Sequence, residues 1–266
     1  MLLVLLGFGV GAFGTLVGAG GGFILTPVLL VLYPHESPQT ITAISLMAVF
    51  FNALSGTIAY ARQRRIDVRS GIVFGAATMP GAIAGALLVA HVSRAVFDPI
   101  MGVALGVLAL WLIVGGQRPA HAHRWPHAVT RELVDARGAR YAYRVPVVRG
   151  ALYSLAVGFV SSFLGIGGGV IHVPLLVRAL GFPTHIATAT SHFVLAIMAG
   201  TGTITHLLAG SLRDGHGLRR AIALSVGVVA GAQLGAHISL RLSGRTIQWL
   251  LAGALAALAV RLLVSL

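Results

Sequence analysis

The chain has 266 residues, of which 57% are hydrophobic and only 9% charged. A soluble domain carries about a quarter of its residues charged, so this composition excludes a water-soluble protein and indicates one that exposes most of its surface to lipid. The formal net charge of +13 would suggest nucleic-acid binding in a soluble protein. Here all the basic residues are arginine and most lie between apolar segments, so we expect no nucleic-acid partner.

Apolar segments of membrane-spanning length follow one another along the chain. About 20 helical residues cross a hydrocarbon core of about 30 Å, and these segments lack the alternation of barrel strands. We therefore predict an all-α polytopic membrane protein with about seven to eight transmembrane helices. The predicted segments are 2–17, 20–33, 40–61, 70–91 and 96–116 in the first half, and 150–164, 168–182, 186–210, 219–240 and 246–265 in the second.

A polar stretch rich in arginine separates the two halves. Its prolines, Pro119, Pro126 and Pro146, discourage one long helix. Arginine-rich loops usually lie on the cytoplasmic side of a membrane. The predicted organisation is a first transmembrane repeat over 1–116, a basic cytoplasmic linker over 117–149 and a second transmembrane repeat over 150–266.

Three histidines of the linker, His121, His123 and His127, raise the question of a metal site. Nothing in the sequence supplies the remaining ligands or the outer groups that orient metal-bound histidines. We therefore expect a solvated loop and no metal site.

A glycine-rich motif occurs once in each half with the same spacing. The motif Gly18-x-Gly20-Gly21-Gly22-x-Ile24-x-x-Pro27 returns 147 residues later as Gly165-x-Gly167-Gly168-Gly169-x-Ile171-x-x-Pro174. Further along, Ser45 corresponds to Ser191, and a Ser-Gly-Thr-Ile stretch from Ser55 corresponds to Thr-Gly-Thr-Ile from Thr201. The chain is therefore a duplicated unit, and the first apolar segment of each repeat is interrupted by its glycines.

Clustered glycines inside an apolar segment need a physical reason, because each costs about 1 kcal/mol in a helix relative to alanine. Broken helices at membrane depth occur where protein or a water-filled cavity covers them, and transporters aim the N-termini of such half-helices at anionic substrates. Bare glycine amides also let an anion approach closely. The alternative is that the glycines only allow helices to pack closely.

The paired glycine-rich segments, the four-segment repeats and the basic central linker resemble the sulfite exporter TauE/SafE family, also called the toluene sulfonate uptake permease family. The resemblance covers essentially the whole chain, although its motif consists of glycines and a proline rather than reactive side chains. It implies a multi-pass transporter of the cell inner membrane for sulfur-containing or organic anions, such as sulfite or sulfonates. It leaves the substrate and the direction of transport open.

Polar side chains within the apolar segments are candidates for a site, because they are costly in lipid. The acidic residues all fall at segment ends or in loops, which favours an anion over a cation. The alternative for each histidine is a simple hydrogen bond to a neighbouring helix. The predicted substrate-binding residues are Gly18, Gly20, Gly21, Gly22, Pro27, Ser45, Asn52, Gly165, Gly167, Gly168, Gly169, His172, Pro174, Ser191 and His192.

The predicted function is secondary transport of a small anion, with the site between the repeats. The expected partners are that anion and the lipid bilayer, and a homo-oligomer is compatible with the sequence. We expect no cofactor, no catalytic residues and no ATP-driven step, because the chain has no P-loop. The alternatives are a membrane scaffold or assembly subunit and, less favoured, an intramembrane enzyme using Ser191 and His192.

The arrangement of the repeats stays open at this level. If each interrupted segment crosses the membrane, each repeat has four crossings and the halves are parallel. If it is re-entrant, each repeat has three crossings and the halves are inverted. The two arrangements differ by a single arginine in their distribution between the sides, too few to decide.

Overall fold

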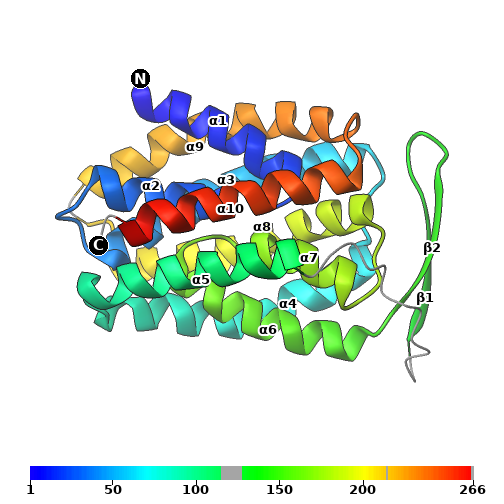
Figure 1. Cartoon of the computed structure of the whole chain (residues 1–266), viewed down its shortest axis with the longest axis horizontal. Helices are drawn as coiled ribbons and strands as arrows, with labels where there is room; N and C mark the ends of the chain where they lie inside the picture. Colours follow the sequence, from blue (N-terminus) through cyan, green and yellow to red (C-terminus); the bar gives the residue numbers. More distant parts are fainter. Residues whose placement is uncertain (115–127, 214, 265–266) are drawn as a thin grey trace.

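A computed structural model describes residues 1–114, 128–213 and 215–264 as a bundle of helices lying side by side along the long axis of the molecule (Figure 1). The first half contains α1 (Leu2–Val17), α2 (Gly22–Leu32), α3 (Pro38–Arg62), α4 (Val68–Leu88), the short 3-10 helix η1 (Val89–His91) and α5 (Arg94–Val114). The second half contains α6 (Val147–Leu164), α7 (Gly169–Arg178), α8 (Thr184–Leu208), α9 (His216–Ser239) and α10 (Gly244–Val264).

The helices confirm a polytopic membrane protein. Within the described residues, 6 helices are long and apolar enough to cross a membrane, and the shorter α1, α2 and α7 are apolar as well. Large hydrophobic side chains such as Val107, Leu152 and Val226 are exposed on the outside of the bundle. That surface is suited to lipid and not to water.

Two strands correct the expectation of an all-α chain. β1 (Val129–Val134) and β2 (Arg140–Val145) form an antiparallel hairpin in what was predicted to be an irregular linker. The sequence pattern that indicates the hairpin is the alternation of Tyr141, Tyr143 and Val145 with exposed residues, because side chains of a strand alternate between its two faces. The linker histidines His121, His123 and His127 lie outside the described residues.

The hairpin is docked on the loop between α3 and α4. The Tyr143 hydroxyl donates to Asp67 Oδ2 at 3.1 Å, and Arg131 Nε lies 3.6 Å from the same oxygen. Burial and the neighbouring Asp67 carboxylate raise the pKa of Tyr143, so the phenol stays protonated and keeps donating. The Ala136 amide in the hairpin turn donates to the Gln63 carbonyl at 3.0 Å. These contacts fix the hairpin at one end of the bundle (Figure 1).

The second interrupted segment is re-entrant. A Cβ placed on Gly150, near the start of α6, would lie 3.1 Å from Leu180, just beyond the end of α7. The start of α6 and the end of α7 are therefore at the same end of the bundle, the end that carries the hairpin (Figure 1). α6 is long enough to cross a membrane by itself, but the chain turns back at Gly165.

The first interrupted segment is re-entrant from the opposite end. Gly7, near the start of α1, packs on the Leu224 backbone of α9. One helical turn before Leu224, Arg220 forms an ion pair with Glu36 and covers the ring of Tyr33, both just beyond the end of α2. The start of α1 and the end of α2 therefore meet at the end away from the hairpin, where both chain termini also lie (Figure 1).

The two halves are consequently inverted with respect to each other. α3 and α8 run antiparallel, since Gly56 faces His192 while Gly200 faces Phe50. The first helix of each half runs parallel to the fourth helix of the other: α1 packs along α9, and α6 along α4. The first helix of each half thus packs within the other half. As a result the two interrupted segments lie back to back in the middle of the bundle.

Candidate functional site

The interruptions occur at the predicted glycines. α1 ends at Gly18 with φ 76° and α6 ends at Gly165 with φ 66°, and Gly20 and Gly167 follow with φ 74° and 71°. This left-handed backbone costs other L-residues about 1–2 kcal/mol each, which explains why glycine stands at these positions. We call residues 18–21 the first break and residues 165–168 the second break.

The two breaks touch each other. A Cβ on Gly22 would lie 2.6 Å from the carbonyl oxygen of Ile166, and one on Gly169 would overlap the Gly18 carbonyl and the Ala19 backbone. From this contact α2 and α7 run to opposite ends of the bundle. The N-termini of both half-helices, which carry the positive ends of the helix dipoles, therefore meet at the centre of the molecule.

Backbone amides at both breaks are buried without an acceptor. In the first they belong to Gly21, Gly22 and Phe23; among the described residues, no oxygen accepts a hydrogen bond from them. In the second break the amides of residues 167–170 are likewise buried, and no oxygen of the described residues accepts a hydrogen bond from them. Buried unpaired N–H groups are rare in proteins, and at a helix N-terminus they favour an anion.

Two carbonyl groups of the breaks, those of Gly165 and Gly20, accept hydrogen bonds from side chains. Ser45 Oγ and Thr26 Oγ1 both donate to the Gly165 carbonyl at 2.7 Å. Asn52 Nδ2 donates to the Gly20 carbonyl at 2.9 Å. These side chains hold the loops in place through their carbonyl groups and do not bond to the free amides.

A polar cluster adjoins the first break. Thr15 Oγ1 lies 3.1 Å from Asn52 Oδ1 and 3.2 Å from His192 Nε2, and the Tyr60 hydroxyl donates to the Thr15 carbonyl at 2.7 Å. His192 Nδ1 and Ser191 Oγ are buried and have no partner among the described residues. Because His192 Nε2 faces Thr15, the structure gives no hydrogen bond that would make Ser191 a nucleophile and His192 its base.

His172 and the two prolines lie apart from this cluster. His172 Nε2 is 3.1 Å from Ser154 Oγ on α6, and its ring packs edge-on against Phe74. Pro27 and Pro174 lie inside α2 and α7, beyond the turns that carry the free amides. The remaining predicted site residues lie in the breaks themselves, at the first residue of α2 or α7, or in α3 and α8.

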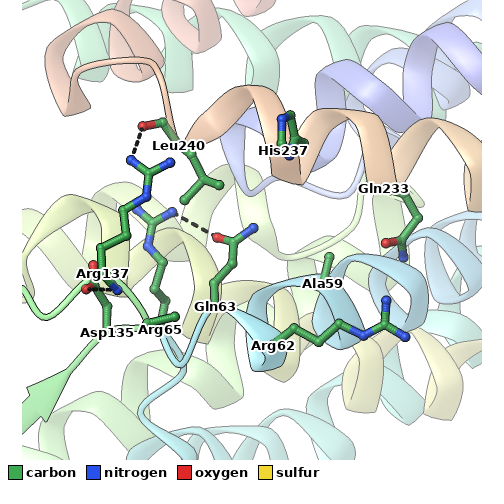
Figure 2. A pocket seen from close by; sticks show the side chains of 10 residues that line it. Ala59, Arg62, Gln63, Arg65, Asp135, Arg137, Gln233, His237 and Leu240 are labelled. Atoms are coloured by element: carbon green, nitrogen blue, oxygen red, sulfur yellow. Dashed lines mark hydrogen bonds between the residues drawn. The ribbon is translucent and has the colours of Figure 1, made fainter.

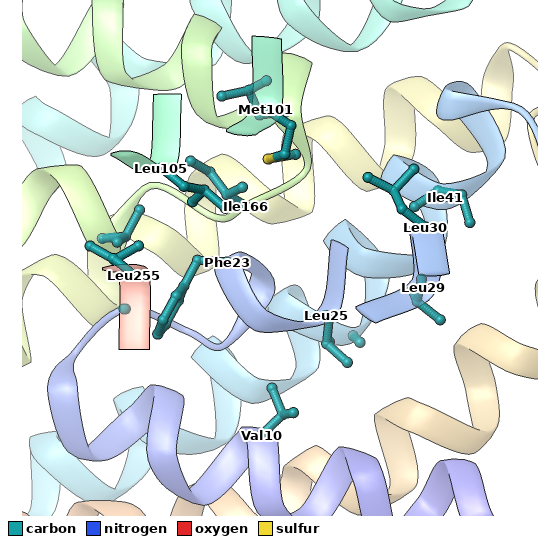
Figure 3. Close-up of a cluster of buried hydrophobic side chains, with 14 of the residues drawn as sticks. Val10, Phe23, Leu25, Leu29, Leu30, Ile41, Met101, Leu105, Ile166 and Leu255 are labelled. Carbon is teal, nitrogen blue, oxygen red and sulfur yellow. The ribbon is translucent and has the colours of Figure 1, made fainter. Parts of the chain in front are cut away.

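Apolar side chains close the space around the breaks. A Cβ on Gly167 would lie 3.0 Å from Val49 and 3.4 Å from Leu195, and both side chains also meet Gly20. On another side, Phe23 and Ile166 belong to the buried cluster that includes Leu105 and Leu255 of α5 and α10 (Figure 3). Val49 and Leu195 would have to move for a solute to reach the free amides from between the repeats.

Comparison with known proteins gives the family. The family described as Sulfite exporter TauE/SafE matches residues 3–262. The chain belongs to this family. The probable membrane transporter protein YunE of Bacillus subtilis is 31% identical to it over 255 residues, covering 93% of this chain and 91% of the relative.

Other relatives of the TauE/SafE chain are similar over comparable lengths. A probable membrane transporter protein of Methanocaldococcus jannaschii is 24% identical, covering 98% of this chain and 94% of its own length. A probable membrane transporter protein of Xylella fastidiosa is 28% identical, covering 90% of this chain and 83% of its own length. No solved structure matches the chain with significance. All three relatives carry the description probable membrane transporter protein, and none of these descriptions states a substrate.

Several residues around the breaks of this TauE/SafE protein were not predicted. Thr15, Thr26 and Tyr60 all bond to the breaks or to the cluster beside them. Thr15 could have been predicted from the repeat. It is a polar residue three positions before Gly18, and Ser162 stands at the same distance before Gly165. Nothing in the sequence pointed to Tyr60, since a tyrosine near a helix end is ordinary at a membrane interface.

Proposed function

We propose that this TauE/SafE protein is a secondary transporter of a small anion, a sulfur oxyanion, sulfonate or other organic anion, which binds where α2 and α7 begin. The observation that supports this most is the set of buried, unpaired amides at two helix N-termini that meet in the middle of the bundle. Such a pair of dipole ends offers donors to a negative solute in an otherwise apolar interior.

The acidic side chains give further support for an anion. Glu36 pairs with Arg220, Asp98 with Arg94, and Asp67 accepts from Ser70 at the start of α4. These carboxylates lie at helix ends and have basic or hydroxyl partners. A cation carrier would need a carboxylate facing its site within the spans.

The inverted halves suggest how the site would be exposed alternately to the two sides. Rocking of one half against the other would open the contact between the breaks toward one end and then the other. Val49 and Leu195 contact both breaks, so they form the apolar barrier that each opening has to displace.

Arginine placement gives the proposed orientation. Most arginines in the described residues lie at the end that carries the hairpin. Those at the opposite end are Arg94, Arg213, Arg219, Arg220 and Arg261. By the positive-inside rule the hairpin end is cytoplasmic, which would put both chain termini outside, in the inner membrane of the cell.

Ser191 provides the sharpest test. It lies on α8 between Thr188, which meets Gly18, and Leu195, which meets Gly20, and its buried hydroxyl has no partner among the described residues. Ser191→Ala removes no hydrogen bond, so we expect unchanged thermal stability in detergent. If the hydroxyl donates to the anion, its loss costs about 1.5–3 kcal/mol, which is about a tenfold or greater loss of flux. The measurement is ATP-independent uptake of sulfite, sulfate, methanesulfonate and small carboxylates into proteoliposomes.

Ser225→Ala is the matched control. Ser225 is buried in α9, and its hydroxyl donates to the Ala221 carbonyl of its own helix at 2.7 Å. It should keep wild-type flux. A folded wild-type protein that moves none of these anions would contradict the proposal and favour a scaffold role.

A further inference from the structure

A second polar site lies at the hairpin end, away from the breaks. A pocket of about 300 Å³ opens between the end of α3, the end of α9 and the turn of the hairpin (Figure 2). Three arginines, Arg62, Arg65 and Arg137, line it together with Gln63 and His237, and Asp135 is its acidic residue. We call it the arginine pocket. Its volume is at the lower end of the range of ligand sites.

Arg65 is the central feature of this pocket. Its side chain is nearly buried, with 4% of the residue exposed. One nitrogen, Nη1, donates to Gln63 Oε1 at 3.1 Å, while Nε is buried without a partner. Among the described residues no carboxylate lies within ion-pair distance of it. Burial lowers the pKa of Arg65, and this effect outweighs Tyr60, Tyr141 and Asp135, which act to raise that pKa. A buried guanidinium without a counter-ion is costly, and an anion would relieve that cost.

Among the described residues Asp135 forms no ion pair with Arg65, although its charge favours the charged arginine, and both of its oxygens accept hydrogen bonds within the hairpin turn. Oδ1 accepts from the amides of Arg137 and Ala139 at 2.9 Å, and Oδ2 accepts from the Tyr141 hydroxyl at 3.5 Å. The Arg137 guanidinium reaches only the Leu240 carbonyl, at 3.4 Å, and lies beside Arg65 (Figure 2). The pocket therefore has more arginines than acids to neutralise them.

We propose that the arginine pocket binds a small tetrahedral or pyramidal oxyanion, and that it is the loading site of the transported anion at the hairpin end. The planar donor fork of arginine matches sulfate, sulfonate and phosphate groups. The loading role rests on the proposed transport function. The anion-binding role does not.

Polar groups continue from the pocket toward the first break. Gln233, on the pocket wall, donates to both the carbonyl and the hydroxyl of Ser55 at 2.8 Å. On the adjacent face of α3, Tyr60 bonds to Thr15 of the His192 cluster. At 1.5 Å per residue, Gln63 and Asn52 are roughly 16 Å apart along α3. Polar side chains therefore line the helix from the pocket to the break, and an anion would use them by displacing the hydrogen bonds that they make here.

The test is equilibrium binding of radiolabelled sulfate and phosphate, each alone, to the purified full-length protein in detergent. Arg137→Gln changes an exposed residue in the hairpin turn and should fold normally, and Arg65→Gln removes the buried cation. We expect at least a tenfold loss of affinity in each. Arg69→Gln, an exposed arginine at the same end outside the pocket, should bind like wild type. Wild-type affinity in both pocket variants, or no saturable binding by the wild type, overturns the proposal.

Two further experiments are needed. The first distinguishes a lipid headgroup from a free anion as the ligand of the pocket, and the second distinguishes failure of the pocket proposal from failure of the transport proposal. If phosphatidic acid stabilises the delipidated protein while neither free anion binds, the pocket is a lipid site and the loading role is overturned. Ser191→Ala should lose flux but keep sulfate binding in the pocket. If the pocket variants lose binding yet keep wild-type flux at subsaturating anion, the loading role is overturned while the transport proposal stands.

Discussion

The two breaks share left-handed glycines at their first and third residues but differ in backbone at the last glycine and in their surroundings. Beside the first, Thr15, Asn52 and His192 form a connected polar cluster. The corresponding residues beside the second break are Ser162, Met198 and Leu46, and the Ser162 hydroxyl has no partner among the described residues. Duplication therefore preserved the element that breaks the helix, whereas the side chains around it diverged. Because the halves are inverted, this divergence makes the two approaches to the centre chemically different.

The difference places the polar approach on one side. The cluster beside the first break lies toward the end of α3 that carries the arginine pocket. The corresponding positions beside the second break hold Ser162 and the apolar Met198 and Leu46. An anion would then meet the amide of Asn52 and the ring of His192 when it approaches from the hairpin end, and Met198 and Leu46 on the other path. This difference suits a transporter with different affinities on its two sides.

The largest effect in this comparison is expected from alanine at the last glycine of each break. Gly21 has φ 82° and packs on Val10, whereas the corresponding Gly168 has φ −62° and faces the flexible side chain of Met198. Gly21→Ala should destabilise the protein by about 2–5 kcal/mol, from left-handed strain and overpacking together. Gly168→Ala should stay within about 1 kcal/mol of wild type. Thermal unfolding in detergent measures both, and equal losses would contradict the assigned backbone difference.

A smaller effect is expected from leucine at corresponding positions of α3 and α8. Asn52→Leu leaves the Gly20 carbonyl without its donor, which costs about 1–3 kcal/mol, while the Thr15 hydroxyl keeps only His192 as a partner. Met198→Leu conserves volume in an apolar site and should cost less than about 1.5 kcal/mol. Flux should fall sharply in the first variant and stay near wild type in the second. Similar flux in both would mean that the polar cluster does not contribute to transport.

The sequence predicted the breaks because glycine clusters are strong local signals. The repeat of Gly18–Gly22 at Gly165–Gly169 located both turns, and the apolar segments gave the helices that follow. Inversion was beyond the sequence, since it depends on whether a half-helix turns back, which is decided by packing such as that of Gly150 on Leu180.

The site was predictable only in part. Asn52 and His192 were expected because polar groups in spans are costly, and they do lie beside a break. His172 was chosen for its place in the motif, but its side chain points to Ser154. The arginine pocket was missed, because an arginine in a basic loop looks solvated and its burial depends on a hairpin that was not predicted.

The smallest effect concerns the carbonyl of the second break, which has two donors. Ser45 and Thr26 both donate to Gly165, so Ser45→Ala leaves that carbonyl paired and should cost only about 0.5 kcal/mol. Thr26→Val alone should cost a similarly small amount. The double variant leaves a buried carbonyl bare, so its loss should exceed the sum of the single losses by about 1 kcal/mol or more. Additive losses in thermal unfolding would show that the two hydroxyls do not share this acceptor, and the second break would then be held by packing alone.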